Sequence, residues 1–426
     1  MTYQIPSASM ALNWVWIGFF TVAFATAVVR WLLGEHGILQ ALMTAMFDGA
    51  RTGFEISLGL AGVMALWLGL MRVGERAGMI ELLARLAGPL LRRLFPGVPQ
   101  GHPAQGAMTM NISANLLGLD NAATPLGLKA MRELQTLNTE PAGTASNAQI
   151  MFVVMNTAGL TLIPTSVIAI RQSIALKQGL GASFNAADIF LPVLLVTFIS
   201  LLAGVLAVAV CQRLPLWRPR FLLPVLAVGA LLAAAVTALA RRPAEEAARV
   251  AGATGAGVIL SVVMVFVLAR AFKRINVYDA FIDGAKEGFG VAIQIVPYLI
   301  AILIAIGVFR AAGCMDFLLS GIGAAVAAMG WNTDFLPALP VGLMKVLSGA
   351  GARGLMIDVM QVHGVDSFPG RLAAIVQGST ETTFYVLAVY FGSVGIQHAR
   401  HALACALVAD AVGLAAAIGV GYAMLR

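Results

Sequence analysis

The stretch Asp48-Gly-Ala-Arg-Thr-Gly-Phe54 occurs a second time in the chain, as Asp283-Gly-Ala-Lys-Glu-Gly-Phe289. The same offset of 235 residues aligns the glycines Gly78 and Gly313, and it also aligns an acidic residue three positions after each of them. A match of this length, in register with the hydropathy pattern around it, indicates an internal duplication. The chain is therefore predicted to consist of two homologous halves.

Composition places these halves in a membrane. Of the 426 residues, 60% are hydrophobic and 11% are charged, and the mean hydropathy is +0.89. Soluble domains are about 45–50% apolar and about 25% charged. The surplus of apolar residues cannot be buried inside one globular core, so it must face lipid. A soluble fold is excluded.

Apolar runs long enough to cross a bilayer, which takes roughly 20 residues, recur along the chain. Together with weaker or polar-interrupted runs, they predict an all-α integral membrane protein with about eleven membrane segments. The strong runs are 12–33, 54–71, 189–210, 221–239, 251–267, 291–309 and 399–424, and the weaker or interrupted ones are 108–131, 150–170, 336–360 and 372–391.

The duplication predicts three parts. Residues 1–215 form the first repeat, residues 246–426 form the second, and the unmatched apolar run within residues 216–245 is a linker transmembrane helix. Halves related by a pseudo-two-fold axis are common in secondary transporters, with the binding site where they meet. The sequence leaves inverted and parallel halves equally open.

Charge and rare residues argue against several other classes. The net charge of +7 comes from arginines in short loops such as 213–220, which is typical of cytoplasmic loops, so we expect lipid and no nucleic acid as partner. The three cysteines and five histidines show no metal-ligand spacing, and we expect neither a metal nor another cofactor. Signatures of hydrolases and nucleotide-binding enzymes are also missing from the sequence, and we expect no enzymatic activity.

Polar residues interrupt the apolar segments at corresponding positions of the two halves. In the first half, Asn111 and Asn115 share one helix face. Gly118 and the polar residues after it form a helix stop, and Thr124-Pro125 can begin another helix. We therefore predict two half-helices that meet at residues 119–123, a break tolerated at membrane depth only beside protein or water.

The second half carries glycines and ionisable residues at the matching position. Three glycines, at positions 349, 351 and 354, follow Ser348 and are flanked by Lys345 and Asp358. Such charges are costly in a membrane without a partner or a wet cavity. Further along, the run Gln377–Thr383 interrupts an apolar block; its Glu381 is the first candidate for a proton or cation relay, and Asp410 in the last block is the second.

We predict that the polar residues that interrupt these apolar segments form one binding site. Such residues also serve as interhelical hydrogen-bonding groups or buried ion pairs, so a non-transporting membrane scaffold is the alternative to a transporter of a small polar solute. The predicted solute-binding residues are Asn111, Asn115, Asp120, Asn121, Thr124, Asn156, Ser348, Gly349, Arg353, Gln377, Ser379 and Thr380, and the residues predicted to couple transport to Na⁺ or H⁺ are Glu381 and Asp358.

These stretches also resemble a known family. Residues 111–131, which begin Asn-Ile-Ser-Ala-Asn-Leu-Leu-Gly-Leu-Asp-Asn, are similar to the signature of spore maturation protein A. Residues 347–354 (Leu-Ser-Gly-Ala-Gly-Ala-Arg-Gly), 364–368 (Gly-Val-Asp-Ser-Phe) and 377–395 (beginning Gln-Gly-Ser-Thr-Glu-Thr-Thr) are similar to spore maturation protein B. The chain thus resembles a natural fusion of the two, apart from the linker span.

The resemblance carries expectations of its own. That family contains the nucleoside recognition, or Gate, domain, which is related to concentrative nucleoside transporters and to the gate of a ferrous iron transporter. It implies a permease-like fold with broken or re-entrant helices in a bacterial inner membrane, and a nucleoside-like or other small organic solute. Ala350 departs from the family's Ser-Gly-Ser-Gly form and removes one hydroxyl from the expected site. Homo-oligomerisation is left open, because no interface is marked.

Overall fold

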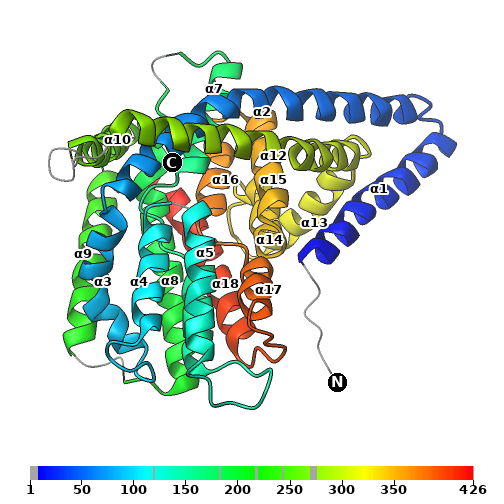
Figure 1. The fold of residues 1–426 in the computed structure, drawn as a ribbon. Helices are drawn as coiled ribbons and strands as arrows, with labels where there is room; N and C mark the ends of the chain where they lie inside the picture. The colour runs from blue at the N-terminus through cyan, green and yellow to red at the C-terminus, as the bar shows by residue number, and fades with distance from the viewer. Residues whose placement is uncertain are drawn as a thin grey trace.

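The computed structural model describes residues 8–118, 120–181, 184–215, 219–241, 244–268 and 276–425 (Figure 1). All regular elements in these ranges are helices. In the first part of the chain they are α1 (Ala8–Leu32), α2 (Ile38–Arg76), α3 (Met79–Leu94), α4 (Pro103–Leu116), α5 (Asp120–Gln135), α6 (Asn147–Thr157), α7 (Thr165–Lys177), η1 (Ala186–Ile189), α8 (Phe190–Gln212) and α9 (Pro219–Ala240). The second part contains α10 (Ala244–Leu268), α12 (Val277–Ala311), α13 (Cys314–Ala328), η2 (Leu336–Ala338), α14 (Leu339–Leu347), α15 (Gly349–His363), α16 (Phe368–Gly378), α17 (Thr383–Gly392) and α18 (Ala402–Met424).

Six of the described helices are long and apolar enough to cross a membrane. Three shorter apolar helices accompany them, at Gly252–Leu268, Cys314–Ala328 and Leu336–Leu347. The chain is therefore a multi-pass helical membrane protein, although these helices do not reproduce the predicted number of about eleven segments. The six long helices lie at Asn13–Leu32, Ile38–Arg76, Ala186–Gln212, Leu222–Leu239, Val277–Ala311 and Ala402–Met424.

Elements of similar length follow one another in the same order on either side of α9. The helices α6 and α16 both have 11 residues, and α8 and α18 both have 23. The glycines that precede α3 and α13, Gly78 and Gly313, both have left-handed backbones, with φ of 82° and 80°. A residue with a side chain rarely adopts this conformation, which explains why glycine stands at both turns.

The two copies of the repeated stretch lie inside continuous helices. The sequence predicted membrane spans that start only at residues 54 and 291, whereas α2 has 39 residues and α12 has 35. The repeated glycines do not end these helices because they face the partner helix. A Cβ atom on Gly53 would lie 3.0 Å from Cα of Ile300, and one on Gly288 would lie 2.8 Å from Cα of Ala65.

Contacts between α2 and α12 are reciprocal. Gly53 meets Ile300 and Gly288 meets Ala65, and both Gly53–Gly288 and Ala65–Ile300 are separated by the repeat offset. Residues early in α2 meet residues late in α12, so the two helices run antiparallel. They lie side by side across the top of Figure 1, above the more upright α4, α5, α8 and α18.

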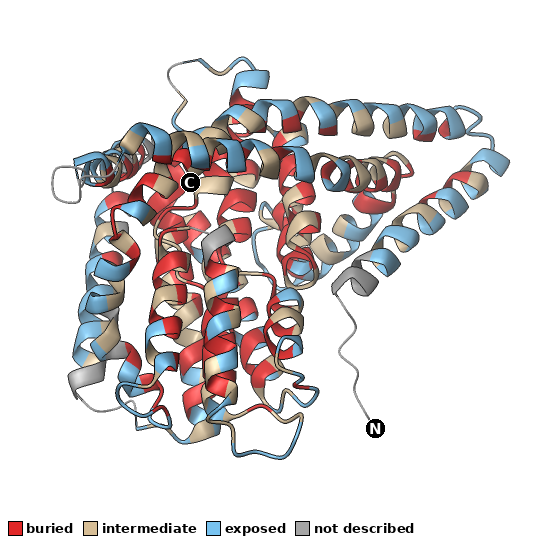
Figure 2. Cartoon of the chain, viewed as in Figure 1, coloured by how far each residue is buried: buried red, intermediate tan, exposed pale blue. Residues whose placement is uncertain are grey.

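The central helices bury their facing sides, whereas the outer helices expose apolar side chains. Figure 2 shows buried residues on the facing sides of the central helices, while α1 and α9 are largely exposed. Exposed large side chains include Trp14, Phe24 and Leu32 on α1, and Leu223 and Leu231 on α9. Apolar side chains this exposed are stable in lipid, where water is excluded.

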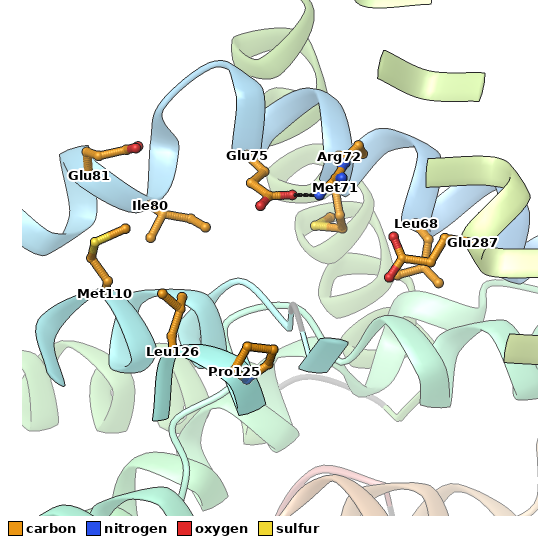
Figure 3. Close-up of a pocket in the computed structure, with 10 residues that line it drawn as sticks. All are labelled: Leu68, Met71, Arg72, Glu75, Ile80, Glu81, Met110, Pro125, Leu126 and Glu287. Atoms are coloured by element: carbon orange, nitrogen blue, oxygen red, sulfur yellow. Dashed lines mark hydrogen bonds and ion pairs between the residues drawn. The ribbon is translucent and has the colours of Figure 1, made fainter. Parts of the chain in front are cut away.

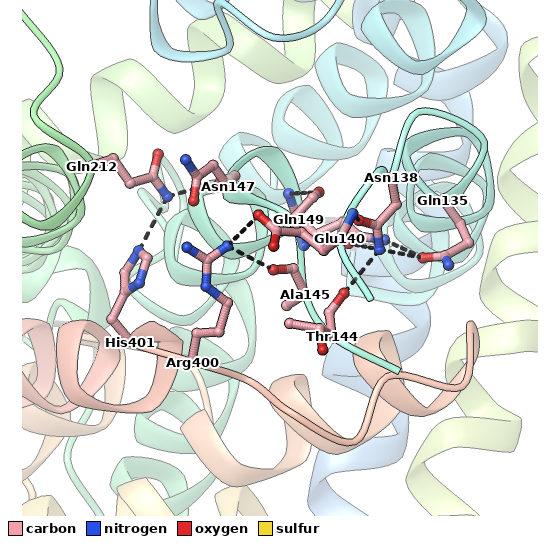
Figure 4. Close-up of polar contacts among 11 residues, drawn as sticks. Gln135, Asn138, Glu140, Thr144, Ala145, Asn147, Gln149, Gln212, Arg400 and His401 are labelled. Carbon is pink, nitrogen blue, oxygen red and sulfur yellow. Dashed lines mark hydrogen bonds and ion pairs between the residues drawn. The ribbon is translucent and has the colours of Figure 1, made fainter. Parts of the chain in front are cut away.

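The α5–α6 loop and the α17–α18 loop are joined by hydrogen bonds and an ion pair (Figure 4). The backbone N–H groups of Gln397 and His398 donate to the Gly143 carbonyl at 2.8 and 2.9 Å. Arg400 pairs with Glu140 at 2.9 Å. Burial, and then the nearby Arg400 charge, lower the pKa of His401, whose ring meets Gln212 at 3.2 Å. The α5–α6 loop is thereby fastened to the α17–α18 loop.

Candidate functional site

Helices break in pairs at four places, two in each half. In the first half, α4 ends at Leu116 and α5 begins at Asp120, while α6 ends at Thr157 and α7 begins at Thr165. Gly118, with φ of 70°, makes the first turn possible. The predicted break is confirmed, although α5 begins before the predicted Thr124-Pro125 start.

The second half breaks at the matching places. Ser348 alone separates α14 from α15, and its hydroxyl accepts a hydrogen bond from the Gly351 N–H at 3.1 Å. This is an ordinary N-cap, in which a side-chain oxygen satisfies an unpaired helix N–H group. The glycines predicted to break the helix therefore lie in its first turns. The other break separates α16 from α17 at residues 379–382.

Direct backbone contacts hold the breaks against each other. The Glu381 N–H donates to the Thr157 carbonyl at 2.8 Å, which joins the α16–α17 break to the end of α6. The Leu162 N–H donates to the Leu116 carbonyl at 2.8 Å and joins the two breaks of the first half. In the second half, a Cβ on Gly349 would lie 2.7 Å from Oγ1 of Thr382. Only glycine allows this approach without a shift.

A polar cavity of about 60 Å³ lies where these breaks meet. Residues at or next to each of the four breaks line its wall. The first half supplies Gly118 and the 161–167 segment, which includes the first turn of α7. From the second half come Lys345, Arg353, Gln377, Gly378, Thr380 and Glu381. Most of the wall is polar, in a protein whose composition is predominantly apolar.

A larger cavity of about 240 Å³ adjoins the polar cavity. The two share Gly118, Thr165, Ser166 and Arg353, and the larger one is otherwise lined mainly by apolar residues of α2 and α12, such as Trp67 and Ile295. Together they approach the lower end of the roughly 300–1,000 Å³ range of small-molecule sites. The antiparallel helices α2 and α12 therefore line the larger cavity that adjoins the polar cavity at the four breaks.

A third, outer pocket of about 370 Å³ follows along α2 (Figure 3). It shares Leu68 with the second cavity and is lined by the Arg72–Glu75 pair, joined at 2.6 Å, together with Glu81 and Glu287. In Figure 3 these charged side chains lie above Met110, Leu126 and Pro125 of α4 and α5. The three spaces thus follow one another from a charged outer pocket to the polar cavity.

The asparagines form a separate hydrogen-bonded network. The Asn115 amide donates to Oδ1 of Asn156 at 2.8 Å, and the Tyr390 hydroxyl donates to the same oxygen at 3.3 Å. The Asn111 amide donates to the Ala123 carbonyl at 2.8 Å and to the Tyr390 hydroxyl at 3.3 Å. Because Asn111 and Asn156 are buried, this network fastens α4 and α6 of the first half to α17 of the second.

Among the cavities lined by described residues, those that Asn115 and Glu381 border are different. Asn115 instead borders an apolar cavity of about 250 Å³ between α3, α4, α6, α8 and α9. Gly159 lies between the two residues: it lines the apolar cavity, and a Cβ atom on it would lie 3.6 Å from Cγ of Glu381. The predicted single site therefore divides into a polar cavity and an asparagine network.

Other predicted residues lie elsewhere. Asp358 forms a salt bridge with Arg310 of α12 and does not line the polar cavity. Ser379 is buried and donates to the Val376 carbonyl at 2.7 Å. Thr124 is half-buried in α5. The side chains of Asp120 and Asn121 lie outside the described part of the structure.

Two participants were absent from the predicted site. Tyr390 lies in an apolar run and was not selected, because a lone tyrosine near an aromatic cluster carries no positional signal. Arg171 is fully buried and forms a salt bridge with Asp188, 17 residues away. An arginine at the end of an apolar segment is a signal that could have marked this pair, since a buried charge needs a partner.

The fold and the cavity define a class: multi-pass helical membrane proteins whose helices break in pairs around a polar cavity. The profile of the Gate family, described as nucleoside recognition, matches residues 57–173 and 292–397, more than half of the chain. The chain belongs to this family, as its motifs indicated. The two matches begin at positions separated by the repeat offset.

Two relatives from Bacillus subtilis (strain 168) each match part of the chain. Spore maturation protein A is 38% identical over 189 residues, which cover 44% of this chain and 89% of the relative. Spore maturation protein B is 43% identical over 151 residues, which cover 35% of this chain and 83% of the relative. The chain is thus homologous to both proteins, as in a fusion of the two. No solved structure matches it.

Proposed function

We propose that this protein is a secondary transporter of a small polar solute and that the polar cavity is part of the solute path. One observation carries the proposal: the breaks of both halves converge on a single polar cavity. Broken helices in a membrane are stable only beside protein or a water-filled space, and transporters place them at the solute site between repeats. The reciprocal contacts between α2 and α12 support duplicated, inverted halves.

The cavity wall indicates the kind of solute. It combines the positive Lys345 and Arg353 with the negative Glu381 and with the amide and hydroxyl groups of Gln377 and Thr380. Such a wall suits a small molecule with several hydrogen-bonding groups, for which a nucleoside or another small organic compound qualifies. The outer pocket and the cavity beneath α2 and α12 provide the approach.

Ion coupling is assigned to Glu381 in the first instance. Glu381 is half-buried in the cavity wall, where a change of protonation or cation contact would be felt by a bound solute. Asp358 is a weaker candidate, because its charge is already balanced by Arg310. We further propose that the protein works in the bacterial inner membrane without catalysing a reaction.

The hydrogen-bonded asparagine network favours one alternative. Polar groups that satisfy one another, as Asn115, Asn156 and Tyr390 do, need no solute and can serve only to hold helices together. A membrane scaffold would use such networks throughout. The alternative is weaker at the polar cavity, because the ionisable Lys345, Arg353 and Glu381 all line that one cavity.

Uptake into proteoliposomes tests the proposal. Radiolabelled nucleosides, nucleobases, dicarboxylates and amino acids are offered with and without Na⁺ or a pH gradient. We expect uptake of one class, dependent on one gradient, that Glu381→Gln uncouples from the ion while leaving the protein folded. Unchanged uptake and unchanged ion dependence in Glu381→Gln would remove the assignment of Glu381.

A further inference from the structure

The last helix contains a buried carboxylate that the solute cavity does not use. Asp410 lies near the middle of α18, and its residue is 7% exposed. Its Oδ2 accepts a hydrogen bond from the Thr383 hydroxyl at 2.6 Å. Its Oδ1 is buried and has no hydrogen-bond partner. A carboxylate oxygen accepts hydrogen bonds and cannot donate them, so Oδ1 can take up a proton, a cation or a hydrogen bond from a donor group.

The surroundings of Asp410 come from both halves. On the α8 side, the Ser200 hydroxyl is engaged with the Ala409 carbonyl at 3.0 Å and leaves the carboxylate to others. On the α16–α17 side, Thr380 lies beside the carboxylate, and its Cγ2 would touch a Cβ atom on Gly413 at 3.1 Å. The charged group that faces Asp410 is Lys345 of α14, itself buried.

Thr380 connects this carboxylate with the solute cavity. It lines the polar cavity together with Gln377, whose Oε1 is the second buried acceptor in this region without a donor. Thr380 therefore lies between Asp410 and the polar cavity, and a change of charge at Asp410 acts on a residue of the cavity wall. Thr383 begins α17 directly after the break that carries Glu381, so the same change also acts on the orientation of that break.

A proton fits this site better than a metal ion. Hard metal cations take a shell of six to eight oxygen atoms, as calcium does, whereas a single unpartnered oxygen is satisfied by one proton. Burying an ionised carboxylate is costly unless it is paired, and such a group neutralises by taking up a proton. Lys345 opposes this by favouring the ionised form. These opposing influences allow the group to take up and release a proton.

We propose that Asp410 is a proton-binding site and that, through Thr380 and Thr383, its occupancy is coupled to the solute cavity. The proton site stands on the geometry around Asp410, and its coupling role rests on the proposed transport function. In this assignment Asp410 binds the proton, and the change in its charge alters the position of Glu381 through the α16–α17 break.

Carbodiimide labelling of the full-length protein in detergent tests the proton site. Dicyclohexylcarbodiimide reacts with protonated carboxyl groups in apolar surroundings, and the labelled residue is located by mass spectrometry of peptides. We expect labelling of Asp410 that falls about tenfold for each pH unit above its midpoint. Asp188, which is buried and paired with Arg171, is the internal control and should stay unlabelled.

Two variants sharpen the result. Lys345→Met removes the facing positive charge and should move the labelling profile of Asp410 to higher pH. Asp410→Asn keeps the shape and an acceptor for Thr383, and should reduce the pH dependence of the melting temperature. A folded protein whose Asp410 stays unlabelled at every pH, while the denatured chain is labelled, would overturn the proposal. Suppression of labelling by Na⁺ at constant pH would replace the proton with sodium and overturn it equally.

The labelling result is independent of uptake. Labelling of Asp410 in a protein that transports none of the solutes would keep the proton site and remove its coupling role. Proton-driven uptake that persists in Asp410→Asn would leave transport standing and return coupling to Glu381.

Discussion

At the scale of single residues, the buried polar side chains show why the halves stay together. Tyr390 of the second half donates to Asn156 and accepts from Asn111 of the first half, both at 3.3 Å. Its ring also stacks on Phe152, with ring centroids 5.8 Å apart. One side chain thus combines aromatic packing with two hydrogen bonds between halves.

Replacing Tyr390 with phenylalanine should therefore destabilise the protein. The ring and its stacking remain, but the two asparagines lose a partner in a buried place, which costs about 1–3 kcal/mol. Thermal unfolding in detergent measures the loss. Tyr278→Phe, on an exposed residue of α12, is the matched control and should stay within about 0.5 kcal/mol of the parent. Equal stability of both variants would show that the network is unimportant.

Arg171 makes a second prediction at this scale. It is fully buried and pairs with Asp188, and it lies 5.2 Å from the ring centroid of Phe184. Arg171→Ala leaves the Asp188 charge buried with the more distant Arg371, at 3.5 Å, as its remaining partner, and should cost about 3–5 kcal/mol.

The control for Arg171 is an exposed ion pair on α2. Arg51 pairs with Glu55 at 2.7 Å, but the arginine side chain is 81% exposed. Arg51→Ala should therefore cost less than about 1 kcal/mol. If unfolding in detergent gave Arg51→Ala the larger loss, the buried pair would have no special structural role.

At the scale of elements, the repeated stretch acquires its physical meaning from helix packing. The sequence predicted its duplication and placed it at the entry of a membrane span, with the spans themselves starting only at residues 54 and 291. The structure shows that Gly53 and Gly288 face the antiparallel partner, where a side chain would meet backbone. Partner contacts of this kind cannot be inferred from one segment alone.

The closely packed glycines can be tested by a pair of substitutions on α12. A Cβ atom on Gly288 would lie 2.4 Å from the Met64 carbonyl oxygen, whereas Gly290 has no atom within 4 Å. Gly288→Ala should destabilise by about 1–3 kcal/mol through overpacking. Gly290→Ala should be neutral or gain up to about 1 kcal/mol. The same unfolding assay decides, and equal effects at both positions would contradict close packing of α2 against α12.

The breaks were easier to predict than the long helices. Gly118 and the polar residues around it mark a helix end by local chemistry, and the structure confirms a break there. The site they form was only partly predictable. Arg353, Gln377, Thr380 and Glu381 do line one cavity, but nothing in the sequence separates them from the Asn115 network, because that division depends on how distant segments pack.

At the scale of the whole molecule, transport requires the halves to move against each other. The helices α8 and α18 belong to different halves and pack together, and their cysteines Cys211 and Cys405 lie with Sγ atoms 3.8 Å apart. A disulfide needs about 2.05 Å between the sulfurs, so oxidation can join the two helices after a small adjustment.

Oxidative cross-linking should therefore block the proposed transport. We expect copper-phenanthroline to join Cys211 to Cys405, and the cross-linked protein to keep solute binding while losing most of its uptake. Cys211→Ser is the control and should be unaffected by the oxidant. Full uptake by completely cross-linked protein would show that α8 and α18 do not move apart at this end during transport.

The central claim is that the polar cavity at the four breaks binds a small polar solute. A thermal-shift screen of nucleosides, nucleobases, dicarboxylates and amino acids tests it most directly, because a ligand of the folded state raises the melting temperature. The account predicts a specific shift that is lost in Arg353→Met and kept in Asn115→Ala, whose side chain borders another cavity. A shift lost in Asn115→Ala but kept in Arg353→Met would contradict it and move the solute site to the asparagine network.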